Sequence, residues 1–325
     1  MTFTPRRGLA AACLCILAGG AHAQASVAAY GLVDLSVGRF QAPGAAAIKA
    51  VESGKMTTSH LGFRGTEALG NGLAAVFVLE HFLRADTGSA GRFDGDVFWA
   101  RNAYVGLSGA FGAVHAGRIT TSLFVNTLLF NPFGDSFGFS PSIRHFFTSG
   151  TTTGDSAWGD SVRYTSPKFG GASFTAHVAA GEGNGGRNTG VSALYGGGAL
   201  GLSAAWQKAE KGATLADTTT WQLGASYDFK QAKVYAQFGQ VDNDTTGNRY
   251  SITELSAAVP LGTAGKALLQ WGRIDPKTGA ERTTVSVGYD HQLSRRTDVY
   301  AVFMSDKLRG LATGNSTGVG VRHRF

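Results

Sequence analysis

The stretch ITTSLFVNTLLFNPFGDSFGFSPSIRHFFTSGTTTGDSAWG, residues 119–159, separates two segments that have the composition of β-strands. Roughly forty residues are too many for an ordinary connection between strands, and loops of that length are usually functional or disordered. This one carries seven phenylalanines from Phe124 to Phe147, together with Trp158, whereas disordered segments are poor in aromatic residues. We therefore expect an ordered loop whose aromatic side chains pack against another part of the chain.

The composition around this loop favours a single β-domain. The chain has 325 residues, of which 47 are glycine and 7 are proline, with 16% charged residues and a mean hydropathy of −0.02. It is too polar for a helical membrane bundle and too glycine-rich for an ordinary helical domain. Because all-β barrels of this length form one domain, the length does not require two.

Residues 1–23 have the three parts of a secretory signal peptide. Residues 6–7 are both arginine, residues 9–17 are apolar, and residues 21–23 read Ala-His-Ala, a small-residue cleavage site. The apolar run is shorter than the roughly 20 residues that a spanning helix needs. We predict an exported protein that is cleaved after Ala23, with Ala25 as the alternative, and a mature domain of residues 24–325.

The mature chain would contain no cysteine, because Cys13 and Cys15 leave with the signal peptide. It therefore needs no disulfide and has no thiolate metal site or cysteine nucleophile. Removal of Arg6 and Arg7 lowers the basic residues from 29 to 27 against 22 acidic ones, a net charge of +5. Export argues against nucleic acid as the partner of that charge.

Alternating segments of about ten residues recur along the mature chain, which is the sequence signature of a transmembrane β-barrel. In residues 27–40, Val33, Leu35 and Val37 share one face while Asp34 and Ser36 share the other. Strands with one apolar and one polar face suit a wall between lipid and water. The inside of such a barrel is the large surface against which the long aromatic loop would pack.

The connections between these segments alternate between short and long, which predicts sixteen strands with seven turns on one rim and eight loops on the other. A closed barrel leaves no unpaired sheet edge in lipid. A soluble sandwich is the alternative, but it gives no reason for loop lengths to alternate. The short turns are expected at residues 68–72, 109–112, 168–171, 196–199, 229–231, 261–265 and 293–296, and the loops at 41–54, 85–96, 119–159, 181–188, 209–217, 242–248, 276–280 and 306–315.

Five motifs occur in a recognisable order: Tyr30-Gly31-Leu32-Val33-Asp34, Leu61-Gly62-Phe63-Arg64-Gly65-Thr66-Glu67, Ala103-Tyr104-Val105-Gly106-Leu107-Ser108-Gly109, Ser161-Val162-Arg163-Tyr164-Thr165-Ser166-Pro167 and Val321-Arg322-His323-Arg324-Phe325. In this order they resemble the general porins of Gram-negative β-proteobacteria, and the resemblance covers essentially the whole mature chain. It implies a homotrimer of sixteen-stranded barrels in the lipid of the cell outer membrane, each with a water-filled pore for small hydrophilic solutes and ions.

The resemblance also implies which residues form the pore constriction. In that family the third external loop folds into the lumen, and residues 131–135, Asn-Pro-Phe-Gly-Asp, are similar to the signature near its tip. The family places a basic cluster on the opposite wall, to which Arg64, Arg101 and Arg118 correspond by motif. The position of His60 is usually arginine in the family, so this chain departs from the pattern there.

Charged side chains near this loop predict a weak to moderate preference for anions. Arginine stays charged at any relevant pH, and fixed guanidinium groups lower the energy of an anion in a pore. The loop supplies few carboxylates to offset them, since only Asp135 and Asp155 are expected to face Arg144 and His145.

A plain structural role remains the alternative for each charged residue near the constriction. Arg118 and Arg163 would then only brace the loop or solvate the wall, and His60 would only line the lumen. Under the sharper hypothesis, protonation of His60 adds positive charge to the pore below neutral pH. Likewise, the loop phenylalanines are expected to hold the loop against the wall, and a slide for ligands is the alternative.

No motif predicts an enzyme, a metal centre or a cofactor. Residues 181–186 satisfy the pattern G-x-G-x-x-G, but a strand is expected after them and a nucleotide site needs a helix there. The histidines lack the spacing H-E-x-x-H, and Ser108 lacks the context of a nucleophile elbow. Two other functions stay open: a channel specific for an organic anion or sugar, and an outer-membrane enzyme or adhesin on the same barrel.

Overall fold

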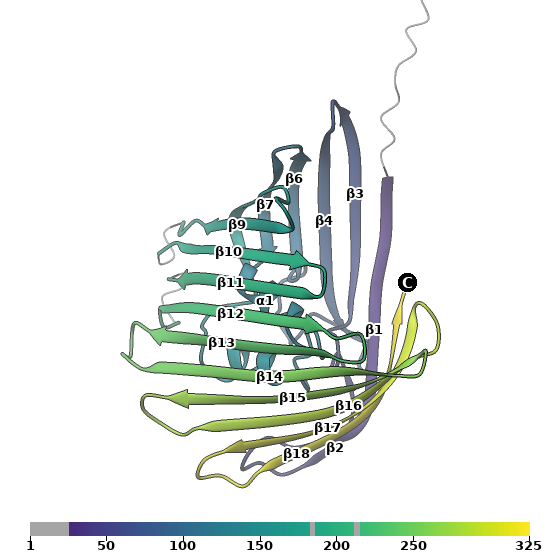
Figure 1. Cartoon of the computed structure of the whole chain (residues 1–325), viewed down its shortest axis with the longest axis vertical. Coiled ribbons are helices and arrows are strands. Elements are labelled where there is room, and N and C mark those ends of the chain that lie inside the picture. The colour runs from purple at the N-terminus through teal and green to yellow at the C-terminus, as the bar shows by residue number, and fades with distance from the viewer. Residues whose placement is uncertain (1–25, 183–185, 211–214) are drawn as a thin grey trace, which may run out of the picture.

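The computed structural model describes residues 26–182, 186–210 and 215–325 (Figure 1). The predicted signal peptide lies outside the described residues, as do parts of the predicted loops at 181–188 and 209–217. The described chain is almost entirely antiparallel β-structure, with two short helices placed between the seventh and eighth strands. In this respect the prediction of an all-β fold is confirmed.

The strands follow one another along the chain and pair with their sequence neighbours. They are β1 Ser26–Phe40, β2 Ile48–Ser53, β3 His60–Gly70, β4 Leu73–Arg84, β5 Ser89–Ala90, β6 Asn102–Gly109, β7 Gly112–Thr120, β8 Ala157–Thr165, β9 Ala172–Ala179, β10 Asn188–Gly197, β11 Leu200–Ala209, β12 Thr218–Asp228, β13 Lys233–Asn243, β14 Arg249–Leu261, β15 Gly265–Pro276, β16 Arg282–Gln292, β17 Thr297–Leu308 and β18 Gly314–Arg324.

The sheet closes because β1 pairs with the last strand as well as with its sequence neighbours. Residues 32–39 of β1 pair with β18, while its two halves pair with β3 and β2 in turn. Strands β2 and β3 are thus the two halves of one wall strand, and the two-residue β5 pairs only with the end of β4. The eighteen strands of the described residues therefore make a closed wall of sixteen, as the sequence predicts.

A carboxylate inside the barrel causes the break between β2 and β3. The backbone amides of Met56 and Thr57 donate to Oδ2 of Asp34 at 2.7 Å and 2.8 Å, and the backbone amide of Asp34 donates to Oγ of Ser59 at 2.9 Å. These bonds hold residues 54–59 inside the wall. The prediction was wrong here in two ways: β2 lies within the predicted loop 41–54, and the next strand begins at His60 instead of Lys55.

The two faces of the wall differ as the alternation predicts. Asp34 and Ser36 of β1 are buried on the inside, whereas Val37 is 55% exposed on the outside. Because outward residues such as Val105 and Phe174 are similarly exposed, the outside is the apolar face that lipid requires. In residues 26–182, 186–210 and 215–325, no helix is long and apolar enough to cross a membrane.

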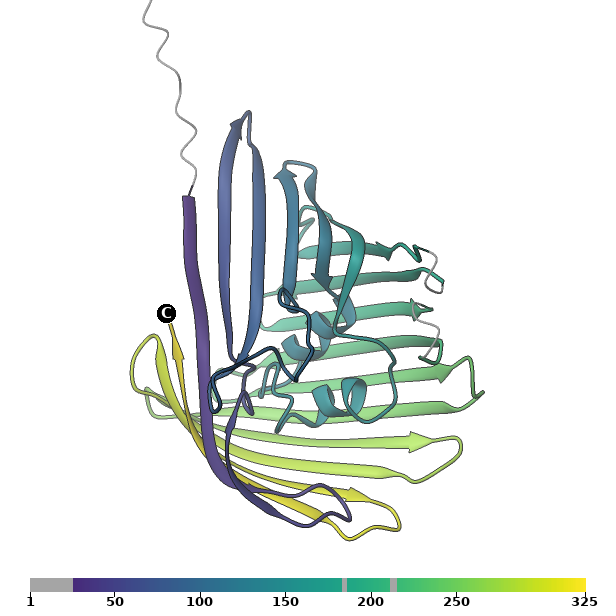
Figure 2. The same ribbon diagram turned by 180° about the vertical axis from the view of Figure 1, so that it is seen from behind.

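The long aromatic stretch folds into the barrel as predicted, and we call residues 121–156 loop 3. It contains α1 Ser122–Leu129, capped by Thr121, and α2 Pro141–Phe147, capped by Ser140, with Pro141 in the first turn. Proline is favoured there because its missing N–H would lack a helical partner anyway. Helix α1 contacts β10, β11 and β12, and α2 contacts β14, β15 and β16, so that both lie on the inner side of the sheet (Figure 2).

The buried apolar core of the protein lies between loop 3 and this part of the wall. One cluster joins Phe133 and Phe139 of the loop to apolar wall side chains that point inward. A second cluster joins Phe146 to inward side chains of β13, β14 and β15. The lumen face therefore carries apolar side chains beneath the loop, beside buried polar ones such as Gln222, Gln237 and Gln270. The wall members of the two clusters are Phe40, Leu268, Tyr300, Val302, Met304, Val241, Ile252 and Ile274.

Candidate functional site

Phenylalanines of loop 3 sit against glycines of the wall. A Cβ atom built on Gly239 would lie 2.9 Å from Cζ of Phe146, and one on Gly224 would lie 3.0 Å from Cγ of Phe130. Real Cβ atoms rarely or never approach other atoms so closely, and the carbonyl oxygen of Trp221 and Oγ of Ser203 would lie closer still, the former at 2.7 Å, so no larger residue fits beside the rings. The wall thus provides seats for the two rings.

The tip of loop 3 uses the same device on the other side of the barrel. A Cβ atom on Gly288 would lie 3.1 Å from Cε1 of Phe133, and one on Gly318 would lie 3.0 Å from Cζ of Phe139. Both rings are buried. These contacts agree with the expectation that the loop phenylalanines hold the loop to the wall.

Buried hydrogen bonds also fix α2 to the wall, and those of His145 are an example. His145 lies with Nδ1 2.6 Å from Oε1 of Glu254 and with Nε2 2.8 Å from Oγ1 of Thr284. His145 and Glu254 are buried and both ring nitrogens are partnered. Buried polar groups that are fully paired specify one arrangement, so α2 has a defined position.

On the opposite wall, Arg101 lies in a cluster around Glu80. Its Nε is 3.2 Å from Oε2 of Glu80. Glu80 also accepts hydrogen bonds from the hydroxyl of Tyr30 at 2.8 Å and from Nδ2 of Asn102 at 2.5 Å. Arg101 therefore lies beside a carboxylate of the wall that largely compensates its charge, and its role in the constriction stays a prediction.

Arg64 enters the same region without such a partner. Its guanidinium carbon lies 4.8 Å from the ring centroid of Tyr30, a cation–π contact on the lumen side of the wall. Among the described residues, no carboxylate lies within ion-pair distance of Arg64, which is exposed to the lumen. Arg64 is thus a fixed positive charge that no neighbouring carboxylate of the described residues compensates.

His60 and Asp135 complete this cluster. His60 is buried, with Nδ1 3.0 Å from the carbonyl oxygen of Thr58, and its ring meets that of Tyr30 edge-on. Asp135, at the tip of loop 3, lies 4.0 Å from Nη1 of Arg101. The loop thus approaches the arginines of the wall. The effect of His60 protonation on the pore charge stays a prediction.

Arg118 belongs to a second cluster, at the base of loop 3. Its Nε donates to the carbonyl oxygen of Ala100 at 2.6 Å, and its Nη2 contacts Asp155. Arg92 lies in the second long loop, residues 85–96. It donates two hydrogen bonds of 2.8 Å and 3.0 Å to the same Asp155, and it also bonds to Asp96. Arg118 therefore braces the two loops.

The surroundings of Asp155 keep its carboxyl ionised. Burial raises the pKa of Asp155, but the hydrogen bonds and charge of Arg92, together with the charge of Arg118, outweigh burial and hold that pKa below its usual range. The second and third loops are consequently joined by a charged contact at neutral pH.

The expected partners of Arg144 and His145 were wrong. Arg144 pairs with Asp306 of β17 at 2.8 Å, and Asp306 also pairs with Arg282 at 2.5 Å. Asp135 instead lies beside Arg101, and Asp155 pairs with Arg92 and Arg118. The sequence could not show this, because the partners of Arg144 and His145 lie on strands more than a hundred residues away.

Arg163 lies on the lumen face of β8, apart from the other predicted residues. In the register of the sheet it stands between His115 of β7 and His177 of β9. Its Nη1 donates to the carbonyl oxygen of Thr120 at 3.2 Å. The structure therefore brings together His60, Arg64, Arg101 and Asp135, and it leaves Arg118, Arg144 and Arg163 in three separate places.

Sequence reasoning missed Tyr30 and Glu80 as members of the site. A signal was present for both: Glu80 is a single acidic residue in the apolar run of residues 76–82, and Tyr30 shares the polar face of its strand with Asp34. A lone carboxylate on the inner face needs a partner, and Arg101 provides one. No group of three or more His, Cys, Asp or Glu residues suited to a metal is found in the part of the chain that is described.

A closed sixteen-stranded wall with an apolar outside, whose lumen is partly obstructed by an inward loop, is the architecture of a β-barrel channel of outer membranes. The chain belongs to the Gram-negative porin family, whose model matches residues 9–311. It is 31% identical to outer membrane porin protein 32 of Delftia acidovorans, over 98% of this chain and 100% of that protein. An outer membrane porin protein of Bordetella pertussis is 28% identical, over 98% of this chain and 99% of that protein.

A solved structure agrees with this assignment. An anion-selective porin from Comamonas acidovorans superposes with a TM-score of 0.82 at 27% identity, covering 93% of this chain and 100% of that one. The resemblance drawn from the five motifs is therefore confirmed, and with it the location in the outer membrane. The protein is an outer-membrane channel for passive diffusion.

Proposed function

We propose that this channel passes small hydrophilic solutes and ions with a preference for anions. The observation that carries the proposal is the contrast between Arg64, which lacks a carboxylate partner among the described residues, and Glu80 and Asp135, which both lie beside Arg101. The charges of Arg64, Arg101, Glu80 and Asp135 sum to zero, but the side chains of Glu80 and Asp135 are only 8% and 18% exposed, whereas Arg64 is exposed to the lumen, so the charge that permeating ions meet is positive.

The sign of the preference follows from elementary electrostatics. An unpaired guanidinium attracts anions and repels cations, and both effects grow where low-dielectric walls focus the field. Two paired charges act mainly as a dipole, whose field falls off faster with distance than the field of a single charge. Arginine keeps its charge over the whole physiological pH range.

Single-channel recording of the purified protein in a salt gradient tests the proposal. We expect conductance that rises linearly with salt and a reversal potential of the sign that marks anion preference. A reversal potential of zero, or of the opposite sign, would contradict the preference and leave the channel itself standing.

The family and the fold are those of channels, and we infer that the barrel has no catalytic role of its own. The support is the chemistry of the lumen: its charged groups are paired with one another or point into the pore, and Ser108 is a strand residue near a short turn. Hydrolase activity that copurifies with the barrel and is lost in Ser108→Ala would overturn this inference.

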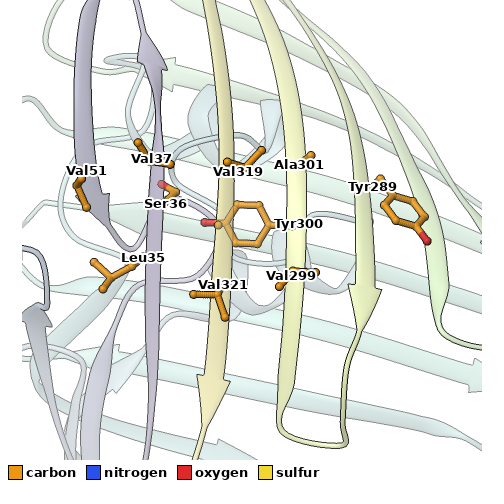
Figure 3. A pocket seen from close by; sticks show the side chains of 11 residues that line it. Leu35, Ser36, Val37, Val51, Tyr289, Val299, Tyr300, Ala301, Val319 and Val321 are labelled. Atoms are coloured by element: carbon orange, nitrogen blue, oxygen red, sulfur yellow. The ribbon is translucent and has the colours of Figure 1, made fainter.

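We infer further that the barrel forms a homotrimer through the outer faces of β1, β2 and β16 to β18. An apolar groove of about 580 Å³ runs there on the outside of the wall, lined in part by Val37, Val51, Ala301 and Val319 (Figure 3). Such a groove lets a second copy approach closely. Ala301→Trp should fill it and weaken the trimer in native electrophoresis, whereas Leu223→Trp, on the outer face of β12, should not.

A further inference from the structure

A cavity opens above the constriction, between the second loop, loop 3 and the break after β2. It has a volume of about 570 Å³, within the range of small-molecule sites. Its polar lining includes Arg84, Arg92, Thr58 and Asp155. Its apolar lining is Leu83, Phe93, Phe137, Phe147 and Leu215.

The apolar part is a rigid aromatic surface. Phe137 stacks on Phe124 at 5.7 Å between ring centroids, and Phe147 meets Phe124 edge-on at 5.2 Å. Phe124 is buried behind them, so that both cavity rings are held in place. Phe93 of the second loop is 56% exposed and lines the same cavity. Phe93 and Phe137 do not belong to the two apolar clusters that join loop 3 to the wall, and Phe147 packs against the edge of the second one.

The polar part offers one available guanidinium. Arg84, the last residue of β4, pairs at 2.5 Å with Asp94, whose side chain is 93% exposed and thus mostly in solvent. Nη2 of Arg84 also donates to the carbonyl oxygen of Ala90 at 3.4 Å, and its Nε is buried and has no hydrogen-bond partner among the described residues. Arg92, by contrast, is held by Asp96 and Asp155. An incoming carboxylate would therefore bind the outer nitrogens of Arg84 in place of the solvent-exposed Asp94.

We propose that this cavity is a binding site for small aromatic monocarboxylates, which it captures before they reach the constriction. The ring of such a solute stacks on Phe93, Phe137 or Phe147, because aromatic pairs gain energy beyond their buried area. Its carboxylate accepts hydrogen bonds from Arg84, and charge-assisted bonds of this kind are the strong ones.

Other solutes fit the lining less well. A sugar would leave most of its hydroxyl groups against Leu83 and the phenylalanine rings, where they find no partners. An organic cation would lie beside Arg84, and the one carboxylate of the lining, Asp155, is already held by Arg92 and Arg118. A small aliphatic anion would gain the contact with Arg84 but not the aromatic stacking.

Binding of benzoate to the detergent-solubilised full-length protein, measured by titration calorimetry, tests the proposal without relying on conductance. We expect saturable binding of benzoate and much weaker binding of acetate and of benzamide. Arg84→Gln should weaken benzoate binding about tenfold or more, and Phe93→Ala about three- to tenfold.

Two variants with matched chemistry outside the cavity serve as controls. Arg249→Gln removes an exposed arginine at the start of β14 that is paired with Asp242, and Phe229→Ala removes an aromatic side chain that is 55% exposed in a short turn. Neither should change benzoate binding. Equal affinities for benzoate and acetate, or affinities unaltered by both Arg84→Gln and Phe93→Ala, would overturn the proposal.

Block of the ion current separates this site from the anion preference proposed above, on which it does not depend. Benzoate added on the side of the long loops should reduce the current saturably, and Arg84→Gln should relieve the block while keeping the open channel. Anion-selective current without any block by benzoate would refute the capture site only. Benzoate binding in a channel without anion preference would refute the proposed selectivity only.

Discussion

The ring of Phe139 in loop 3 covers Gly318 of β18, where a Cβ atom would stand 3.0 Å from the ring carbon Cζ. The other atoms near that position belong to the ring of Phe40, at 3.5 Å and beyond. Since only side chains crowd this glycine, its role is to admit the ring. The position of loop 3 in the lumen thus depends on the absence of a side chain at Gly318 as well as on the wall side chains that contact the loop.

Substitution of this glycine should displace the tip of loop 3. Gly318→Leu overfills the seat of Phe139, and overpacking of this kind costs about 1–3 kcal/mol. We expect a lower midpoint of thermal unfolding in detergent and a larger or noisier single-channel conductance. The loss of stability should be smaller in a Phe139→Ala background, because the space that the ring of Phe139 fills is then empty.

Gly196→Leu is the control for this substitution, since a Cβ atom on Gly196 meets nothing within 4 Å. It should leave both the unfolding midpoint and the conductance nearly unchanged. If Gly318→Leu lowered the unfolding midpoint by the same amount with and without Phe139, the ring and the glycine would not be coupled. The account of how loop 3 packs against the wall would then be wrong.

Removal of the uncompensated charge should weaken the anion preference. A unit charge some 7 Å from a permeating ion in water lowers the energy of an anion and raises that of a cation by about 0.6 kcal/mol each, so Arg64→Gln should lower the anion-to-cation permeability ratio by roughly sevenfold. Reversal potentials in a salt gradient measure this ratio. Arg309→Gln, in an exposed loop where Arg309 pairs with Glu281, should leave the ratio unchanged.

Removal of the carboxylate that compensates Arg101 should have the opposite effect. In Glu80→Gln the amide can still accept a hydrogen bond from Tyr30, while Arg101 loses its nearest opposite charge. We expect a higher anion-to-cation permeability ratio than in the native channel. A lower ratio would mean that Arg101 does not face the path of the ions.

The contact between the second loop and loop 3 should be sensitive to acid. The pKa of Asp155 lies below its usual range because Arg92 and Arg118 outweigh the effect of burial. A depressed pKa stabilises the folded state at neutral pH, and this contribution disappears as the pH falls through the pKa of the folded protein, below the ordinary aspartate value of about 4.

Amide hydrogen exchange, corrected for the intrinsic effect of pH, measures this contact in residues 92–96 and 150–156. Protection should fall only in strongly acidic solution, and Asp155→Asn should reproduce the loss at neutral pH. Protection that was unchanged in Asp155→Asn would show that Arg92 and Arg118 hold the loops without their carboxylate.

Much of the wall is predictable from sequence because its physics is local. Strand alternation in residues 27–40 and the regular change between short turns and long loops report directly on lipid outside and water inside. The same logic fails beneath loop 3, where Val241, Ile252 and Val302 are apolar residues on the inner face. Only the presence of the loop explains them.

The partners of charged residues were the part that sequence could not supply. His60, Arg64, Arg101 and Asp135 do meet at one place. Yet Arg144 finds its carboxylate 162 residues further along the chain, on β17. Closure of a barrel sets such distances, and no local pattern encodes them. The break at residues 54–59 was hidden for the same reason, since it depends on Asp34 of a neighbouring strand.

The most direct test of the account is the reversal potential of single channels of the native protein in a salt gradient. The uncompensated Arg64, in a lumen where the acidic residues of the constriction are paired, predicts a potential of the sign that marks anion flow. A potential of the cation sign would contradict the account, because the net charge at the constriction would then be negative.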